Sequence, residues 1–556
     1  MSSSIDLDNE IKAYALRGVI EYGKTTPGNV LPKLFQHGLK KEDIKTIMPQ
    51  ITKIVSEINK LKKDAAEKEY PKYEKYVVKR EEKEKGIPEI DIKKGMKVVT
   101  RMAPEPSKYN HLGHAMTFLL NYLYAKKYNG KCLLRFEDTN PEKVSQEYVD
   151  AMKSDVLDYL EIKPDAIRFV SDDMPLLYEY AEKLIKMEKA FMCFCNREKM
   201  QDLRHKGIEC ECRMKAESHN MEEWKLFLKG KFKEGEAVLR VKGDMKSQNH
   251  VMRDSVLFRQ INAKHYRHGT KYKVWPMYDF YNPIEDSFMG ITLILRSNEF
   301  DLRVELQDYI KDLLKLDKQM IVQYGRFNVI DFTTKGREIR ELVESGELIG
   351  WDDPRLITLR ALKRRGITKE AIYELTNQVG LSKNQVNLDF DIIAAINRKI
   401  IDKTSNRYFF VPNSISLKII NHPDTEETEI PIHPNKPEVK RVLPVSAADI
   451  SISKQDYETF KGKEIRLLRL YNVKLPIKGK KAQFTSLENK DIPKITWVSL
   501  GTNTKVLMPD GNWIKGKSDS GILNLKEGNI IQFERFGFCR CDKNKKGICE
   551  FWFSHK

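Results

Sequence analysis

The sequence lacks the features of a membrane or secreted protein. It contains no run of about 18 apolar residues that could span a bilayer. Its first ten residues, MSSSIDLDNE, do not follow the basic-then-apolar pattern of a secretory signal. Internal repeats and low-complexity tracts are absent as well. We therefore expect a cytoplasmic protein made of ordinary globular domains, with no membrane partner.

Cysteine is scarce, which excludes a disulfide scaffold. The 556 residues include eight cysteines, and in an intracellular chain these should be reduced. Four of them form two closely spaced pairs: Cys193, Cys195, Cys210 and Cys212. Structural zinc takes four ligands in a tetrahedron, and two thiolate pairs joined by a loop provide such a set. We expect one structural zinc ion here; the alternative is four reduced thiols in a small core.

Length and charge narrow the class of protein further. A chain of 556 residues is too long for one hydrophobic core and predicts roughly three to five domains. Lysine and arginine number 98 against 80 acidic residues, a formal net charge of +18. Such a balance favours a polyanionic partner, because each phosphate contact releases counterions. A solvated, lysine-rich surface would give the same composition, so charge alone does not identify nucleic acid.

The first part of the chain, residues 1–94, is predicted to be a helical domain with a charged linker. Apolar residues between Ile44 and Leu61 recur mostly at steps of three and four, which is typical of an amphipathic helix. A stretch rich in lysine and glutamate follows and continues to about Gly86. The pattern indicates a small helical core with its own linker to the rest of the chain.

A nucleotide-binding α/β core is predicted from residue 95 onward. Residues 97–102 and 132–136 are strand-like, and a helical pattern covers residues 114–128 between them. Strand, helix and strand at this spacing make a parallel βαβ unit of the Rossmann type. A strand at residues 290–295 lies well downstream, so a long insertion divides the core. The predicted parts are the first half of the catalytic domain (95–190), an inserted domain (191–274), the second half (275–330), and a loop with a helical connective domain (331–404).

The last part, residues 405–556, changes to β structure. Short alternating runs are separated by turn signals, and Asp510-Gly511 between two such runs is a strong hairpin signal. We expect one or two antiparallel β-barrels in this part. Cys539 and Cys541 would face the same side of one strand, where core packing is their expected role.

The segment RMAPEPSKYNHLGHA, residues 101–115, carries the first sign of chemistry. His111 and His114 stand where a strand ends and a helix begins, with Gly113 between them. A helix N-terminus offers unpaired N–H groups and the positive end of the helix dipole to phosphate. Histidines placed there can bind triphosphate oxygens and stabilise charge while the α-phosphorus is attacked.

This segment resembles the HIGH signature of class I aminoacyl-tRNA synthetases, and its flanks resemble the glutamyl/glutaminyl subclass. Three further segments agree with that subclass in the same order: RFEDTNP (135–141), YDFYNPIEDSFMGITLILR (278–296) and GWDDPRLITLRALKRRGI (350–367). The helical N-terminal region and the β-rich tail are similar to those of archaeal-type glutamyl-tRNA synthetases. The resemblance covers nearly the whole chain.

The resemblance implies a substrate pocket. Arg101 corresponds to the arginine that receives the side-chain carboxylate of glutamate, and its planar fork suits bidentate binding. Glu137 corresponds to the acidic residue that holds the substrate α-ammonium group. Tyr278 and Asn282 correspond to a substrate-pocket pair, and they share one face if their segment is helical. Arg296 corresponds to a second pocket arginine.

The choice of amino acid depends on the two arginines. Arg101 and Arg296 in one pocket suit a negatively charged side chain, because an unpaired buried charge is costly. Glutaminyl relatives usually lack a basic residue at position 296, which favours glutamate. The neighbouring residues 298–300, Asn-Glu-Phe, are more typical of glutaminyl enzymes, so glutaminyl-tRNA ligation stays the alternative.

The second signature of the class, the KMSKS loop whose lysine contacts the phosphates, is degenerate in this chain. An alignment without gaps places it near residues 333–337, where the usual serine–lysine pair is missing. Lys335 and Arg337 flank the position, and we expect them to bring positive charge to pyrophosphate. Lys108 stands where relatives often carry glycine.

The resemblance thus implies a complete reaction. ATP with Mg²⁺ would activate L-glutamate to glutamyl-adenylate, and the amino acid would pass to the 3′ end of glutamate tRNA; whether glutamine tRNA is also charged stays open. The implied catalytic residues are His111, His114, Lys335 and Arg337. The implied ATP-binding residues are Pro104, His111, Gly113, His114 and Lys335.

The resemblance also implies a separate role for each of two domains. The inserted domain is expected to grip the acceptor end of tRNA and the β-rich tail to read the anticodon, in a protein expected to be a monomer. An alternative of another class is a catalytically silent tRNA-binding scaffold. Only the degenerate loop at residues 333–337 supports that alternative.

Overall fold

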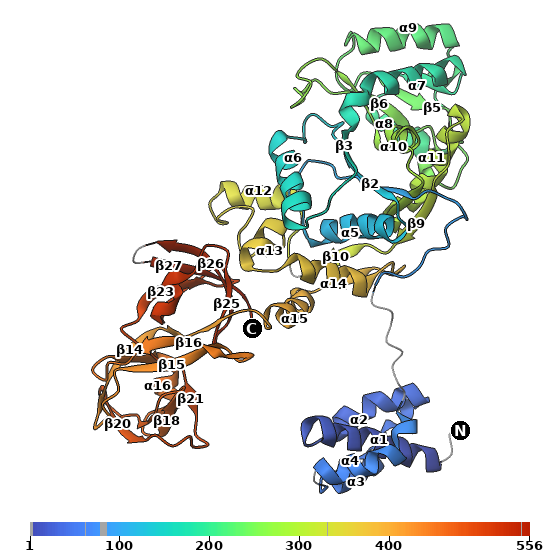
Figure 1. The fold of residues 1–556 in the computed structure, drawn as a ribbon. Coiled ribbons are helices and arrows are strands. Elements are labelled where there is room, and N and C mark those ends of the chain that lie inside the picture. The colour runs from blue at the N-terminus through green and yellow to red at the C-terminus, as the bar shows by residue number, and fades with distance from the viewer. Residues whose placement is uncertain (1–3, 40, 62, 78–85, 331, 546–547) are drawn as a thin grey trace. The chain divides into compact units, whose positions relative to one another are not determined.

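The computed structural model describes residues 4–39, 41–61, 63–77, 86–330, 332–545 and 548–556 (Figure 1). They belong to two compact units, Met1–Lys85 and Gly86–Lys556. Each unit has a hydrophobic core of its own. The predicted charged linker falls partly on residues 78–85, which lie outside the described residues.

The first unit is helical. Its helices are α1 (Ser4–Tyr22), α2 (Pro27–Leu34), α3 (Ile44–Ile58) and α4 (Lys63–Glu69). The amphipathic helix predicted from Ile44 onward is confirmed as α3, which buries Ile51, Ile54, Val55 and Ile58.

The helical unit extends further than its composition suggests. Ala66 is buried in its core, and Tyr70, Tyr73 and Tyr76 pack against that core. These four residues recur at steps of four, three and three, so a lysine- and glutamate-rich segment still presents an apolar face. Residues 63–77 therefore belong to the folded unit rather than to a linker.

The second unit is built on a parallel sheet. Its first strands are β1 (Val99–Met102), β2 (Lys131–Phe136) and β3 (Ala166–Phe169), paired in parallel in the order β1-β2-β3. Helix α5 (Leu112–Lys127) connects β1 to β2, which confirms the predicted βαβ unit. Strands β8 (Leu293–Ser297) and β9 (Met320–Tyr324) form a parallel pair. The Thr292 amide donates to the Val99 carbonyl at 3.0 Å, so β8 runs beside β1.

The core includes residues that the composition change assigns to the linker. Ile87 is buried, and Ile90 and Ile92 pack against the cluster formed by the parallel sheet and α5. The hydroxyl of Tyr128, just after α5, accepts a hydrogen bond from the Ile90 amide at 2.7 Å. The second unit therefore begins at Gly86, before the strand-like residues that mark it in the sequence.

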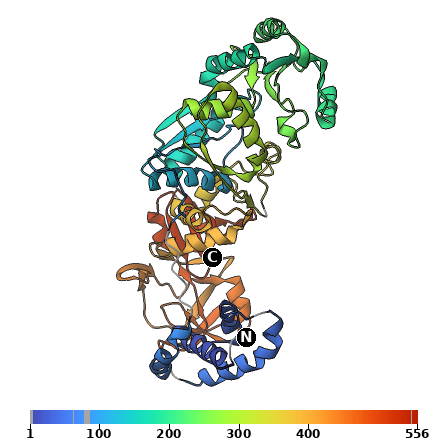
Figure 2. The same ribbon diagram turned by 90° about the vertical axis from the view of Figure 1, so that its right-hand side faces the viewer.

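A long insertion separates β3 from β8. It contains α7 (Met174–Lys186), β4 (Ala190–Cys193), α8 (Arg197–Lys206), α9 (Glu217–Leu228), β5 (Val238–Val241), β6 (Val256–Gln260) and β7 (Val274–Pro276). The four strands form an antiparallel sheet in the order β4-β5-β6-β7. Within the second unit, this sheet and α9 lie on the opposite side of the parallel sheet from the C-terminal strands (Figures 1 and 2).

Helices connect the catalytic core to the tail. Helices α10 (Tyr278–Phe288) and α11 (Asp301–Leu314) flank β8, and the short strands β10 (Phe327–Val329) and β11 (Val386–Leu388) pair in parallel. The connective helices are α12 (Gly336–Glu344), α13 (Leu359–Arg365), α14 (Lys369–Val379) and α15 (Phe390–Ile401). The helical pattern predicted for this segment is confirmed.

The C-terminal part contains two seven-stranded sheets. One is ordered β12-β25-β26-β27-β23-β24-β13 and the other β21-β18-β19-β20-β14-β17-β22. The first sheet consists of β12 (Arg407–Tyr408), β13 (Phe410–Pro412), β23 (Thr502–Leu507), β24 (Trp513–Ser518), β25 (Ile530–Phe533), β26 (Gly537–Lys545) and β27 (Ile548–His555). The second consists of β14 (Ser414–Ile420), β17 (Ile450–Ser453), β18 (Glu464–Leu467), β19 (Asn472–Lys474), β20 (Lys481–Ser486), β21 (Lys494–Ile495) and β22 (Val498–Ser499).

Two more elements accompany these sheets. A separate hairpin joins β15 (Glu427–His433) to β16 (Lys436–Pro444), and the short helix α16 (Lys454–Phe460) follows β17. The hairpin predicted at Asp510-Gly511 is confirmed between β23 and β24, and Gly511 adopts the positive φ of +85° that this turn needs. Cys539 and Cys541 are buried in the core of the first sheet, as expected.

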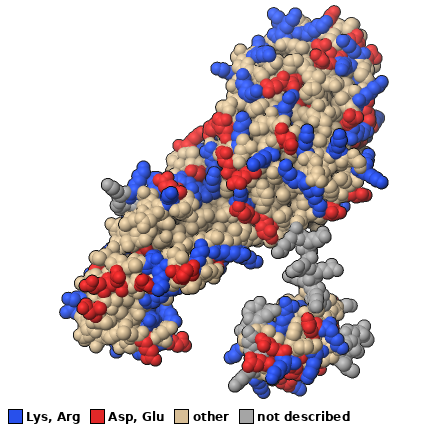
Figure 3. All heavy atoms as spheres, viewed as in Figure 1, with Lys and Arg blue, Asp and Glu red and all other residues tan. Residues whose placement is uncertain are grey.

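The expectation of purely antiparallel barrels needs correction. Both sheets are mixed, because β23 pairs in parallel with β27 and β14 pairs in parallel with β20. Hairpin signals report only on sequence neighbours, and these parallel pairs join strands far apart in the chain. On the face shown in Figure 3, basic side chains are interspersed with acidic ones, so net charge alone does not mark a binding surface there.

Candidate functional site

A cleft of about 560 Å³ opens at the C-terminal ends of β1, β2 and β8. Open α/β sheets bind ligands at this edge, where the helices that follow the strands begin. Eight of the residues expected in the site line this cleft: Arg101, Pro104, His111, Gly113, His114, Glu137, Tyr278 and Arg296. Three do not line it: Asn282, Lys335 and Arg337.

The two histidines form one corner of the cleft at the start of α5. His111 is the N-cap residue, and its Nδ1 accepts a hydrogen bond from the Gly113 amide at 3.1 Å. His114 Nδ1 accepts one from the His111 amide, also at 3.1 Å, and the ring centroids are 3.8 Å apart. Because both Nδ1 atoms accept, the proton of each neutral ring must lie on Nε2.

Burial keeps both rings neutral. It lowers the pKa of His111 to about 3, with the positive charges of Lys108 and Arg326 acting in the same direction. It also lowers the pKa of His114 well below its usual value. The first amides of α5 already have partners, so the donors left for a ligand here are the two Nε2–H groups. Neutral N–H donors at the positive end of a helix dipole can bind phosphate oxygens without themselves changing protonation state.

A buried network of charges forms the opposite end of the cleft. Asp286, on α10, accepts from Arg101 Nε at 2.9 Å and from Arg135 Nη1 at 2.7 Å. Arg135 Nη2 also donates to Glu137 at 3.0 Å. Burial opposes the ionisation of Asp286, but Arg101 and Arg135 outweigh it and lower the pKa of this carboxyl.

Asn282 supports this network from behind the cleft. Tyr278 and Asn282 lie on α10, one turn apart, so the predicted helical face is present. With its amide oxygen toward Arg135 Nη2, at 2.8 Å, Asn282 places its amide nitrogen 3.2 Å from Asp286. In this orientation Asn282 contacts the charges that hold Glu137, and only Tyr278 of the pair faces the cleft.

Arg296 differs from the other arginines because it is not neutralised. Its Nη1 donates to Gln307 at 2.9 Å and approaches the Tyr278 hydroxyl at 3.4 Å, both uncharged partners. Its Nε and Nη2 are buried and have no hydrogen-bond partner. Buried donors are almost always paired, so two unpaired nitrogens of one guanidinium at a cleft favour a ligand that accepts hydrogen bonds from them.

Sequence reasoning missed the centre of the charged network. Arg135 and Asp286 lie inside the family-like segments but received no role, although each contacts two charged partners or more. Both are fully buried, and such buried charges are retained only when they are paired. The available signal was a charged residue in an otherwise apolar strand, Cys132-Leu133-Leu134-Arg135-Phe136.

The degenerate loop keeps its charges on the surface. Lys335 Nζ lies 2.8 Å from Glu338, and Arg337 Nε lies 2.9 Å from Glu341. Their side chains are 77% and 90% exposed. The loop residue that reaches the cleft is Thr334, together with Lys108 from the loop between β1 and α5.

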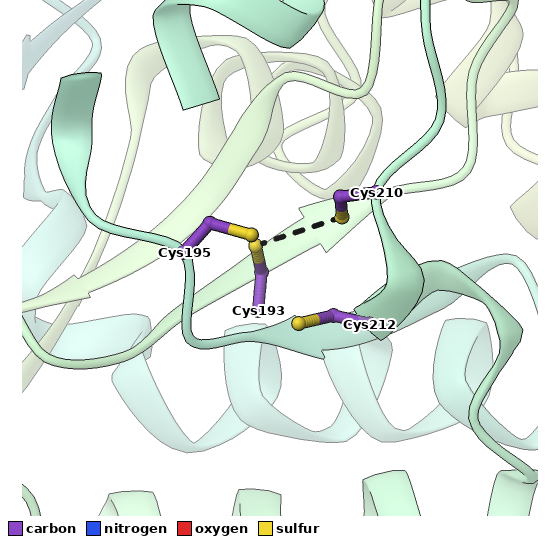
Figure 4. A group of neighbouring side chains, drawn as sticks. All are labelled: Cys193, Cys195, Cys210 and Cys212. Carbon is purple, nitrogen blue, oxygen red and sulfur yellow. Dashed lines mark hydrogen bonds between the residues drawn. The ribbon is translucent and has the colours of Figure 1, made fainter. Parts of the chain in front are cut away.

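The four clustered cysteines come together in the insertion. Cys193 ends β4, Cys195 follows it, and Cys210 and Cys212 lie on the segment after α8 (Figure 4). Their sulfur atoms all lie within 4.8 Å of one another, and Cys193 Sγ is 3.9 Å from Cys210 Sγ. Four sulfurs at about 2.3 Å from a tetrahedral zinc ion are separated by about 3.8 Å, so this set fits zinc.

A cation lies next to the four sulfurs. Arg240 Nη1 is 3.6 Å from Cys193 Sγ and 3.5 Å from Cys210 Sγ. Four thiolates around Zn²⁺ would leave two negative charges, which a buried guanidinium offsets in part. The chemistry of the surroundings therefore agrees with the donor set.

The fold and the cleft together define an α/β protein with two neutral histidines at one end of the cleft and a buried arginine–carboxylate network at the other. Comparison with known proteins makes the class specific. Residues 97–403 match the family tRNA synthetases class I (E and Q), catalytic domain. Residues 405–489 and 477–542 match two families described as tRNA synthetases class I (E and Q), anti-codon binding domain. The chain belongs to the class I tRNA synthetases of the E and Q group.

Relatives similar over the full length carry one name. The chain is 39% identical to a "Glutamate--tRNA ligase" of Pyrococcus abyssi, covering 95% of this chain and 96% of the relative. It is 39% identical to that of Pyrococcus furiosus, covering 98% of each. It is also 39% identical to that of Nitrosopumilus maritimus, covering 99% of this chain and 100% of the relative. In the described residues, no helix is long and apolar enough to cross a membrane.

Proposed function

We propose that this chain is a glutamate–tRNA ligase, which uses ATP to activate L-glutamate and transfers it to the 3′ end of glutamate tRNA. The ligase name of the full-length relatives and the catalytic-domain match support the reaction class. The observation that carries the choice of glutamate is Arg296, whose two unpaired buried donors line the cleft.

The charge balance of the pocket also favours an anionic side chain. Three buried guanidiniums, of Arg101, Arg135 and Arg296, face two buried carboxylates, of Glu137 and Asp286. A further buried carboxylate, Asp279, has its own partner in Arg303. Glu285 does not alter this count near neutral pH, because burial raises its pKa to about 8. One positive charge is left over, and the γ-carboxylate of glutamate would neutralise it. Glutamine would leave it uncompensated.

The proposed reaction needs positioning and electrostatics rather than a covalent enzyme intermediate. An oxygen of the substrate α-carboxylate attacks the α-phosphorus of ATP, and the bond to the bridging oxygen of pyrophosphate breaks. His111 and His114 would donate Nε2–H to phosphate oxygens, with Pro104 and Gly113 shaping the same wall. A Cβ on Gly113 would come within 3.1 Å of the His111 ring and 3.3 Å of the Phe327 carbonyl, so a larger residue here would press on His111. Mg²⁺ bound to ATP would neutralise phosphate charge.

Glu137 and Tyr278 would orient the amino acid. Glu137 is fixed by Arg135 and by the Tyr281 hydroxyl, which lies 3.3 Å from it, so its carboxylate can receive the substrate α-ammonium group. Transfer then follows when a hydroxyl of the 3′-terminal ribose attacks the mixed anhydride and releases AMP. The inserted domain would hold the acceptor end, and the part that matches anticodon-binding families would read the anticodon.

Aminoacylation tests this proposal directly. The purified chain is given ATP, Mg²⁺ and radiolabelled glutamate or glutamine, each with glutamate tRNA or glutamine tRNA. Glutamate transferred to glutamate tRNA is the expected result, and glutamate on both tRNAs would show relaxed tRNA selection. Glutamine transfer would overturn the argument from Arg296. No transfer despite tRNA binding would favour the silent scaffold.

We also propose that Cys193, Cys195, Cys210 and Cys212 hold one structural Zn²⁺. The compact sulfur cluster and the adjacent Arg240 support this assignment. Elemental analysis of the purified chain should give one zinc per chain, and Cys210→Ser should lose it. Cys539→Ser, in the core of the C-terminal sheet, is the matched control and should retain it. A chain that stays free of zinc after expression with added zinc would contradict the proposal.

A further inference from the structure

Lys108, which lines the phosphate end of the cleft, lies close to Gly336. Lys108 is on the loop between β1 and α5, and Gly336 is the first residue of α12. A Cβ added to Gly336 would lie 3.0 Å from Lys108 Cβ and 3.3 Å from Lys108 Cδ. The side chain of Lys108 therefore fills the space that a side chain at position 336 would enter.

The position of this contact is informative. Gly336 lies within residues 333–337, where the family resemblance predicts the signature loop and its phosphate-binding lysine. Lys108 lies where relatives often carry glycine. Of these two contacting positions, the chain thus has lysine where glycine is expected and glycine in the segment where lysine is expected.

The surroundings of Lys108 suit an anionic ligand. The only hydrogen bond of its ammonium among the described residues is a long one, 3.5 Å, to the Thr334 carbonyl, and no described carboxylate forms an ion pair with it. Burial lowers its pKa, and its positive charge reaches both His111 and His114, since it lowers their pKa values. The negative charge of Glu105 acts against this lowering of the Lys108 pKa, but it forms no ion pair with the ammonium among the described residues. A half-buried ammonium without a directly paired carboxylate gains from a ligand that brings negative charge.

The lysine and arginine of the loop itself are placed differently. Lys335 and Arg337 point to solvent and pair with Glu338 and Glu341 on α12. To reach the cleft, both would have to leave these acidic partners. Lys108 lines the cleft already.

We propose that Lys108 is the catalytic lysine of this synthetase and contacts the β- and γ-phosphates of ATP in place of the missing signature-loop lysine. The inference rests on the proposed function and extends it. As the α-phosphorus is attacked and the bond to the bridging oxygen breaks, negative charge grows on the departing pyrophosphate. The Lys108 ammonium stabilises that charge and stays protonated throughout.

The first test compares two lysines in aminoacylation assays with glutamate and tRNA. Lys108→Met keeps the length of the side chain and removes the charge, and it should lower kcat/KM for ATP by about a hundredfold. The KM for glutamate should change little. Lys335→Met should reduce kcat/KM for ATP far less. A large loss in Lys335→Met with near-normal activity in Lys108→Met would overturn the assignment.

The second test moves the lysine back. Lys108→Gly should be as impaired as Lys108→Met, and the double variant Lys108→Gly with Gly336→Lys should recover at least about tenfold of the loss. Gly336→Lys alone should be impaired, because its side chain meets Lys108. A purely structural role for Lys108 predicts no recovery in the double variant, since a lysine on α12 would not restore packing in the β1–α5 loop.

Direct binding separates this inference from the proposed function. Inorganic pyrophosphate with Mg²⁺ is titrated calorimetrically into the full chain, and Lys108→Met should weaken its binding about tenfold or more. Lys318→Met is the matched control and should bind pyrophosphate normally. Lys318 lies just before β9, away from the cleft, and pairs with Asp312. If the wild-type chain charges no tRNA, the proposed function fails while this titration still tests Lys108. Equal pyrophosphate affinity in wild type and Lys108→Met would overturn the inference.

Discussion

At the amino-acid end of the cleft, buried charges contact one another directly. Asp286 lies 2.9 Å from Arg101 and 2.7 Å from Arg135, and Arg135 lies 3.0 Å from Glu137. At the phosphate end, the cleft is lined by two neutral histidines, the half-buried Lys108, and Arg326, which pairs with Glu299 at the surface. The ion pairs near that end, from Lys335 and Arg337, are on the surface.

The two ends of the cleft differ in when their charges are balanced: on folding at the amino-acid end and on ligand binding at the phosphate end. Buried ion pairs are fixed on folding, because removing either partner leaves an uncompensated charge in a medium of low dielectric. The neutral imidazoles are held by hydrogen bonds of the helix start and carry no charge to balance, and Lys108 gains a directly paired counter-charge from the ligand. Substitutions within the ion-paired network should therefore change stability and activity together, whereas those of Lys108 and Arg296, which form no ion pair with a described carboxylate, should mainly change activity.

The largest effect on stability is expected from Arg135→Met. It removes the guanidinium shared by Asp286 and Glu137 and leaves both carboxylates buried with weaker compensation. The free energy of unfolding should fall by about 3–5 kcal/mol, measured by urea denaturation with circular dichroism. Arg168→Met is the matched control, since its pair with Asp173 is partly exposed, and it should cost at most about 1 kcal/mol. Equal costs for the two variants would refute the contrast in burial.

A smaller effect, confined to activity, is expected from Arg296→Gln. Its guanidinium has neutral partners in the folded chain, so its loss leaves no protein carboxylate unpaired. The kcat/KM for glutamate should fall about a hundredfold, while the KM for ATP should hold, because the changed contact is with the γ-carboxylate. Steady-state aminoacylation measures both. A parallel rise in the KM for ATP would show that the two ends are not independent.

Much of the fold was predictable because its signals are local. The strand–helix–strand order places His111 and His114 at a helix start, and Asp510-Gly511 predicts its hairpin, because each involves neighbours in sequence. The parallel pairing of β23 with β27 was not predictable, since no local pattern specifies which distant strand becomes the neighbour.

The functional site likewise has parts that local sequence signals predict and parts that they do not. Residue types at motif positions located the cleft, and the spacing of the four cysteines located their cluster. The ion pair between Arg135 and Asp286 and the approach of Lys108 to Gly336 join residues more than 100 positions apart, so they follow only from the packed structure. The direction of a side chain could not be predicted either. No sequence pattern tells whether a lysine in a loop faces the cleft or the solvent.

The smallest expected effect is a pH dependence of stability that arises at the amino-acid end of the cleft. Glu285, next to Asp286 on α10, is fully buried and both of its carboxylate oxygens lack partners. Burial raises its pKa to about 8, from about 4.5 in the unfolded chain, with Arg135 opposing the rise. Between these values the folded chain binds the proton that the unfolded chain has released. Stability therefore falls as pH rises through this window and levels off above about pH 8.

Glu285→Gln should remove this dependence. From pH 6 to pH 8, wild type should lose about 2 kcal/mol of unfolding free energy relative to the variant, measured by urea denaturation at each pH. Ionisation of Glu285 should also weaken glutamate binding. Above pH 8, three carboxylates would face the three guanidiniums, and no surplus positive charge would remain for the γ-carboxylate of glutamate. The KM for glutamate should then rise more steeply with pH in wild type than in Glu285→Gln. Parallel pH profiles would mean that Glu285 is already ionised at neutral pH, and the charge count that favours glutamate would have to be abandoned.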